Sequence, residues 1–249
     1  MSQVKRRDNA QARITEVIDG AVSPLLTGSG FIKSDSEFWQ MHRVLEQRID
    51  ILELIFADIK GGTPYGLTKH SFAFIASVFI KGIPHPMGAQ LKGIADEPIH
   101  NASGGHFYLR ILPNRLFQGI RSQGFWRIGG SSLMTRLSIA NAVSALRAQA
   151  LPWFDSFSQL QDVLRDSEQA LRQKKFGRSW RENIRSPDLV LGFLSLKLKD
   201  WTLARLHLEK ALSLKNPVHT LDPAEPELLY ASLRPEITAG IELSKQNGP

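Results

Sequence analysis

The chain has 249 residues, of which 42% are hydrophobic and none is cysteine, so it can bury a substantial core but excludes disulfides, thiolate nucleophiles and cysteine-based zinc sites. The basic N-terminus is not followed by an apolar stretch, and the apolar runs are shorter than the roughly 20 residues of a membrane span, so we expect a cytoplasmic protein without membrane helices. The net charge of +7 is local, because six arginines and no acidic residue lie between Pro98 and Phe154.

The first predicted element is a helix over Asn9–Thr27, where apolar residues recur every three or four positions. Gly28-Ser29-Gly30 follows this helix instead of preceding one, so we interpret it as a C-terminal cap and not as a phosphate-binding turn. The next segment, Phe31–Val44, has a strand-like pattern.

Two strong strands are predicted at Arg48–Ile59 and His70–Lys81, and the turn-forming Gly61–Gly66 between them predicts an antiparallel hairpin. The first strand is apolar on both faces, which is typical of a central strand covered on both sides. Glu53 interrupts one of these faces. A buried carboxylate must be paired or protonated, so Glu53 either pairs with an arginine of the basic segment or serves as a general base.

The stretch Gly82–Gly105 has little periodicity and indicates a long loop, after which strand signals return at His106–Leu112 and more weakly at Gly124–Ile128. Three histidines and two acidic residues in or beside this loop are the best metal candidates: His85, His100, His106, Asp96 and Glu97. Imidazole and carboxylate would suit zinc or iron, but the irregular spacing favours ordinary surface histidines, and we predict no metal site.

From Ser131 onward the pattern becomes helical. Leu133, Leu137, Ala140 and Val143 share one face, Pro152 is expected to interrupt the helix, and another helix begins near Ser156 or Ser158. Three further helices are predicted beyond a basic linker, at Asp188–Leu198, Trp201–Leu214 and Glu225–Ser244.

This order of elements is that of an α+β protein: an N-terminal helix, an antiparallel sheet of about four to five strands, and then a helical C-terminal part. We expect two domains, an α+β domain over residues 1–175 and a helical extension over residues 176–249.

The first two thirds of the chain carry packing and turn residues in a characteristic order. They are Val22-Ser23-Pro24-Leu25-Leu26, Gly30-Phe31-Ile32-Lys33, Phe38-Trp39, the strand Ile49–Phe56, Trp126, and Leu151-Pro152-Trp153-Phe154. This order resembles a bacterial family known as domain of unknown function 4304. The resemblance implies no particular chemistry.

A second resemblance lies near the C-terminus, where Leu191-Gly192, Ala204, Leu208, Ala211 and Pro217 are similar to one tetratricopeptide-type helical hairpin. Its small residues, Gly192, Ala204 and Ala211, would let two helices approach closely. One such unit cannot form the concave groove of a repeat array, so we interpret it as a capping hairpin on the main domain.

No phosphate loop, dinucleotide fingerprint, HExxH zinc helix or GxSxG nucleophile elbow occurs in the chain. We therefore predict no catalytic residue and no cofactor. An unrecognised enzyme with its site in the 82–105 loop is kept as an alternative.

The arginine-rich segment is either a solvated face whose arginine stems cover apolar surface, or a binding surface. We predict a non-catalytic module, for example an immunity-like protein, that binds an acidic protein partner. Six residues would carry this contact, because Arg, Tyr and Trp are enriched at important interface positions: Tyr108, Arg110, Arg115, Arg121, Trp126 and Arg127.

Nucleic-acid binding is the main alternative. It is favoured by the same arginines and by the stretch Lys174–Arg181, which interleaves cations with Phe176 and Trp180 as phosphate contact and base stacking require. The two aromatic residues are also four positions apart, as on the apolar face of a short helix.

Overall fold

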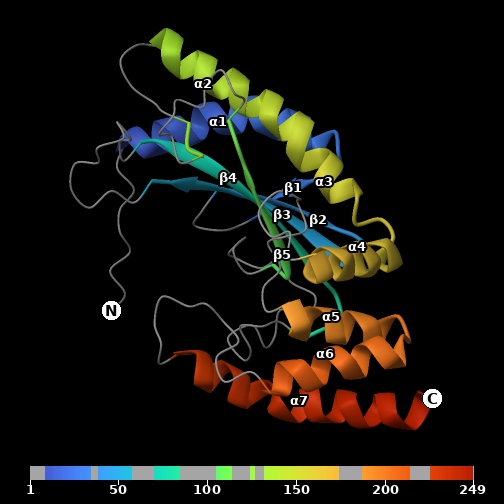
Figure 1. Cartoon of the computed structure of the whole chain (residues 1–249). Helices are drawn as coiled ribbons and strands as arrows, with labels where there is room; N and C mark the ends of the chain where they lie inside the picture. Colours follow the sequence, from blue (N-terminus) through green and yellow to red (C-terminus); the bar gives the residue numbers. More distant parts are fainter. Residues whose placement is uncertain are drawn as a thin grey trace.

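The computed structural model describes residues 9–34, 39–57, 70–84, 105–113, 124–126, 132–173, 187–213 and 225–248, the side chains of 9, 10 and 225–232 excepted. Within these ranges the chain forms an N-terminal helix, a five-stranded antiparallel sheet and a series of helices (Figure 1). The predicted α+β fold is confirmed.

The sheet has the order β1-β2-β3-β4-β5, in which each strand pairs with its neighbour in sequence. Its strands are β1 (Ile32–Lys33), β2 (Gln40–Val44), β3 (Arg48–Phe56), β4 (Phe72–Ile80) and β5 (Phe107–Ile111). The predicted antiparallel pairing of the two strong strands is confirmed, since β3 and β4 pair from Arg48 with Ile80 to Phe56 with Phe72. Where a further strand was predicted around Gly124–Ile128, the described residues show only an isolated bridge between Trp126 and Phe72.

Both faces of β3 are buried, as its sequence pattern predicted. One face, with Leu52 and Leu54, belongs to the main core, over which helices α1 (Asn9–Thr27), α2 (Ser132–Ala145) and α3 (Leu151–Asp155) lie (Figure 1). The other face carries a separate small cluster of Ile49, Ile51, Phe79 and Ile75.

The end of α1 has the geometry that its glycines predicted. Gly30 adopts the left-handed backbone conformation with φ +83°, the Phe31 N–H donates to the Leu26 carbonyl at 3.0 Å, and the Gly30 N–H donates to the Thr27 carbonyl at 3.0 Å. These two bonds define a Schellman cap, which closes the helix and turns the chain into β1.

Helix α2 forms where the pattern predicted a helix, and one expectation for its continuation is wrong. The stripe of Leu133, Leu137 and Ala140 faces outward, with Leu133 59% exposed, while the inward face carries the polar Asn141. Asn141 lies inward because its side-chain oxygen accepts a hydrogen bond from the buried indole of Trp126. Pro152 does not interrupt the helix, because α2 continues through a π-helical turn, η4 (Leu146–Ala150), into α3, whose first turn needs no proline N–H.

The C-terminal part consists of α4 (Leu160–Gln173), α5 (Pro187–Lys197), α6 (Trp201–Ser213) and α7 (Glu225–Asn247). Helices α5 and α6 form a tight hairpin, as predicted: Ala204 and Ala211 are fully buried, and a Cβ placed on Gly192 would lie 2.6 Å from Leu208.

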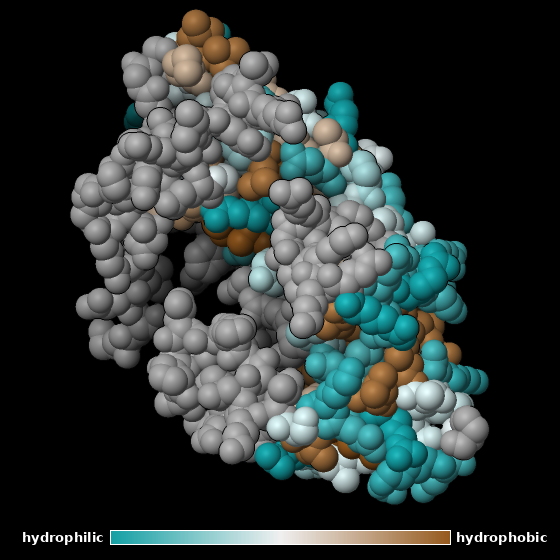
Figure 2. Space-filling model, viewed as in Figure 1, coloured by the Kyte–Doolittle hydropathy of each residue, from teal (hydrophilic) through white to brown (hydrophobic). Residues whose placement is uncertain are grey.

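The predicted domain boundary at 175 and 176 lies outside the described residues. Apolar residues on either side of it, from the sheet and from α5 to α7, belong to one continuous core. In the space-filling view hydrophobic side chains gather at the exposed start of α2 and between hydrophilic bands over α4 and the α5–α6 hairpin (Figure 2).

Candidate functional site

The structure describes three of the six residues predicted to bind a partner. Tyr108 and Arg110 lie on β5, which is the last strand in the order of the sheet, and both are partly buried. Arg115, Arg121 and Arg127 lie outside the described residues, as do the stretch Lys174–Arg181 and most of the loop between residues 82 and 105.

Trp126 is part of the core and takes no part in an exposed surface. It is 1% exposed, its ring stacks on Phe72 with centroids 5.5 Å apart, and its Nε1 donates to Asn141 Oδ1 at 2.9 Å. Its main chain also pairs with Phe72. The sequence indicated a tryptophan before a helix. Only the structure shows that its indole N–H is hydrogen-bonded within the protein.

The guanidinium group of Arg110 is held against Phe125, whose ring centroid lies 4.3 Å from Cζ. Its Nε and Nη2 atoms are buried and have no hydrogen-bond partner among the described residues. Burial lowers the pKa of Arg110 below its usual range, although a guanidinium group remains charged at neutral pH.

A second site with arginines, which the sequence analysis missed, lies on the inner strands β2 and β3. Asp50 is fully buried and accepts hydrogen bonds from Arg48 Nε at 2.8 Å and from Arg43 Nη2 at 2.7 Å. Burial raises the pKa of Asp50, and the hydrogen bonds and charges of Arg48 and Arg43 oppose that rise. The available signal was the ionisable pair Arg48 and Asp50, two residues apart on one face of an apolar strand.

Glu53 is buried on the opposite face of β3, as predicted. It lies in one cross-strand row with Ile75 and Arg110, so two strand spacings separate its backbone from that of Arg110. No ion pair joins these two described residues. The pairing of Glu53 with an arginine of the basic segment stays a prediction.

His106, one of the five predicted metal candidates, has both ring nitrogens engaged by backbone. Nδ1 accepts from the Ile80 N–H at 2.9 Å, and Nε2 lies 3.2 Å from the Pro84 carbonyl oxygen, to which it donates. The ring is fully buried and stacks on Phe79. In the part of the chain that the structure describes, no group of three or more metal-ligating side chains converges.

Three adjoining depressions form a furrow along α4. The first, near Arg43 and Arg48, shares Glu46, Gln47, Ser158 and Leu160 with the second. The second shares Gln161 and Leu198 with the third, which has a volume of 590 Å³. The furrow thus runs from the β2–β3 turn past the start of α4 to the α5–α6 hairpin.

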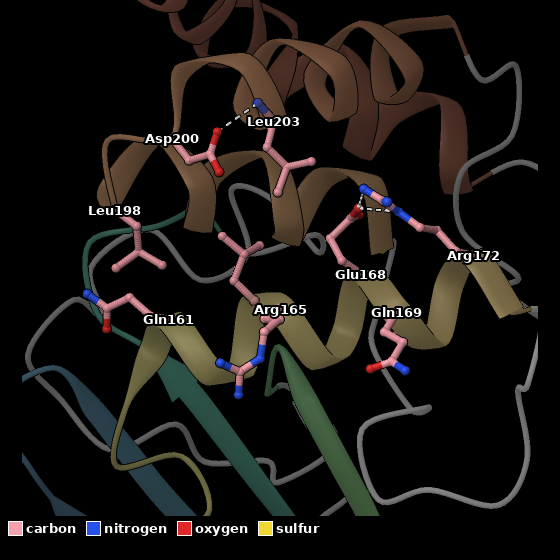
Figure 3. A pocket seen from close by; sticks show the side chains of 9 residues that line it. Gln161, Arg165, Glu168, Gln169, Arg172, Leu198, Asp200 and Leu203 are labelled. Carbon is pink, nitrogen blue, oxygen red and sulfur yellow. Dashed lines mark hydrogen bonds and ion pairs between the residues drawn. The ribbon is translucent and has the colours of Figure 1, made fainter.

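The third depression has an apolar floor and a polar rim (Figure 3). One wall is a stripe of α4 at helical spacing, formed by Gln161, Leu164, Arg165, Glu168, Gln169 and Arg172. The other wall comes from the hairpin, where Leu198 and Leu203 are partly buried and pack on the core. Asp200 closes this wall, and its Oδ1 accepts the Leu203 N–H at 3.0 Å.

A buried charge cluster fixes the furrow's two walls to each other. His207 on α6 contacts Glu168 on α4 through Nε2 and Asp188 on α5 through Nδ1, the latter at 2.7 Å. Each ring nitrogen thus faces a carboxylate oxygen. His207 therefore has no ring nitrogen left to act as a general base on a ligand in the furrow, and its role is to join three helices.

Arg172 also binds Glu168, at 3.1 Å, and Arg165 binds Asp162 at 2.7 Å. The cluster and the furrow were not predicted, because their residues are far apart in sequence. Polar residues on the inward faces of α4 and α6 were the available signal, and it is a weak one.

Among the described residues no helix combines the length and the apolar composition that a membrane span requires. Comparison of the chain with protein-family models, with curated proteins and with solved structures finds no match. The resemblances to family 4304 and to a tetratricopeptide hairpin therefore stay predictions.

Proposed function

We propose that this protein is a non-catalytic interaction module, which binds a segment of a partner protein in the furrow between α4 and the α5–α6 hairpin. The observation that carries the proposal is the composition of the 590 Å³ depression, a leucine floor enclosed by a polar rim. Leucines that pack on the core and still line an open depression form a receptor for an apolar side chain of a partner.

The rim fits a peptide backbone. Gln161 and Gln169 each offer an amide that donates and accepts hydrogen bonds, as the N–H and C=O groups of an extended segment require. The charges of this wall are already paired, Arg165 with Asp162 and Arg172 with Glu168. A furrow whose cations are paired supports apolar and amide recognition better than binding to phosphates.

Peptide selection with two matched variants tests this function. Peptides selected on the wild-type protein from a displayed random library should bind Leu203→Gln at least tenfold more weakly, because Leu203 lies in the furrow. They should bind Leu206→Gln normally, because Leu206 lies on the same helix, is 44% exposed and is not part of this depression. Circular dichroism confirms that both variants fold.

Two results would contradict the proposal. Selected peptides that bind Leu203→Gln as tightly as the wild type do not use the furrow. Repeated selections that yield no peptide, together with salt-sensitive binding of a generic DNA duplex, would favour the nucleic-acid alternative, since phosphate contacts weaken steeply with salt.

A further inference from the structure

The buried cluster of His207, Glu168 and Asp188 needs one proton more than a neutral imidazole and two carboxylates supply. His207 is 2% exposed, and its two ring nitrogens each lie at hydrogen-bonding distance from a carboxylate oxygen, Nδ1 from Asp188 and Nε2 from Glu168. Each hydrogen bond needs a proton between nitrogen and oxygen, whereas a neutral imidazole carries one N–H and an ionised carboxylate none. The additional proton belongs to the cluster as a whole, because its groups titrate together.

Loss of that proton opens one of the two contacts. A ring nitrogen without a proton presents a lone pair to a carboxylate oxygen, and two acceptors that close together repel each other. In a buried site this is costly, since the carboxylate is left without a donor.

Glu168 is the contact that can open. Its Oε2 already accepts from Arg172 Nη2 at 3.1 Å, and Glu168 lines the open third depression of the furrow (Figure 3). Asp188 has no second donor among the described residues. It also stays beside the ring because α5 and α6 pack closely at Gly192, where a Cβ would lie 2.6 Å from Leu208.

Other charged groups near His207 make no bond to it among the described residues. On α6 itself, Lys210 lies one turn further along and is exposed. Helix α7 packs against α6, and its Glu236 is partly buried, with one carboxylate oxygen that is buried and has no partner. The proton count at His207 is therefore set by Glu168 and Asp188, with Arg172 acting through Glu168.

We propose that the cluster is a proton-dependent clamp on the furrow, which holds Glu168 against α6 when both protons are present and releases its carboxylate into the third depression when one is lost. The consequence for a partner rests on the proposed function of the furrow. A released carboxylate beside Leu203 would have to be desolvated by an apolar side chain, so binding should weaken as the pH rises.

The clamp itself can be tested without a ligand, by NMR of the full-length protein. The ring nitrogens of His207, assigned by loss of their signals in His207→Gln, are followed from about pH 5 to about pH 9, around the range in which histidines commonly change charge. The backbone amides of Gln161, Arg165 and Gln169 on α4 should shift with the same midpoint as the ring.

Asp188→Asn is the main test variant, because Asp188 does not line the third depression. The asparagine amide can donate to Nδ1, which leaves the Nε2–H of a neutral ring for Glu168. Both contacts then form without the additional proton, so the α4 amides should lose their response to pH. Glu168→Gln is the second variant, since its amide can donate to Nε2 while Nδ1–H donates to Asp188, and it should lose the response as well.

Peptides selected on the furrow give the second measurement. At constant ionic strength they should bind the wild type about fivefold more weakly at about pH 8.5 than at about pH 6, and Asp188→Asn equally at both.

Two outcomes would overturn the clamp: α4 amides that do not follow the His207 ring in the wild type, or the wild-type response retained in both variants. If no peptide binds at any pH, the proposed function of the furrow fails, and the NMR response still decides whether the clamp exists.

Discussion

The inner strands and the last strand of the sheet hold the same residue type in different surroundings. On β2 and β3, Arg43 and Arg48 surround Asp50, and Arg48 Nη2 also donates to the Phe154 carbonyl at 2.9 Å, which ties β3 to α3. On β5, Arg110 stacks on Phe125, and its buried Nε and Nη2 have no acceptor among the described residues. The arginine with an acid in register stabilises the fold through an ion pair, whereas the arginine without one is held by an aromatic ring.

The largest expected effect is at Asp50 on β3. Asp50→Asn keeps the shape of the side chain but removes the charge that the buried Arg48 and the partly buried Arg43 share. We expect a loss of about 3 to 5 kcal/mol in the free energy of unfolding, the range for breaking a buried ion pair, measured by urea denaturation.

Asp155→Asn is the matched control for this change. Asp155 also contacts Arg43 Nη2, at 3.5 Å, but its side chain is 71% exposed, and exposed pairs contribute about 1 kcal/mol or less. Equal losses in the two variants would contradict the assignment of Asp50 as the centre of the cluster.

The sequence predicted the elements better than the contacts between them. Helix α1, its glycine cap and the β3–β4 hairpin follow from short-range patterns, because apolar periodicity and turn residues act over a few positions. Arg43 faces Asp50 only because the turn between β2 and β3 sets their register. No pattern in the sequence fixes that register by itself.

The sites were less predictable than the fold for the same reason. Glu168, Asp188 and His207 meet only when three helices pack, so neither their cluster nor the furrow beside it could be predicted. The acid-free segment was predicted as one binding surface, but the same argument included Trp126, which is a core residue. Composition identifies a charged segment and does not show which of its side chains face outward.

Asp19 offers an intermediate case, a partly exposed carboxylate that joins α1 to the strands. It accepts hydrogen bonds from Lys33 at 2.7 Å, Ser23 at 2.6 Å and Trp39 at 2.7 Å. Burial raises the pKa of Asp19, but these hydrogen bonds and the charge of Lys33 outweigh it and hold the pKa below 3.8. Its stabilising contribution is therefore complete above the unfolded pKa near 4 and is lost as the pH falls through the lower folded pKa.

Asp19→Asn should lower the free energy of unfolding by about 1 kcal/mol at pH 7, since the carboxylate is partly screened by solvent. Below pH 4 the difference from the wild type should shrink, because the wild-type carboxylate becomes neutral as well. Urea denaturation at pH 7 and pH 3 measures both values. A difference that grows at pH 3 would contradict the lowered pKa.

The smallest expected effect is at Arg110, and it sharpens the contrast with Arg48 most directly. Arg110→Met removes two buried donors that have no partner among the described residues, while the thioether can still pack on Phe125. The lost cation–π contact and the relieved burial of polar atoms act in opposite directions, so the free energy of unfolding should change by about 1 kcal/mol or less.

Arg48→Met should instead cost about 3 kcal/mol in the free energy of unfolding, because it leaves the buried Asp50 with one arginine. Urea denaturation of the two variants side by side decides the matter: a large loss in Arg110→Met would mean that its guanidinium group supports the fold, and Arg110 would then belong with Arg48.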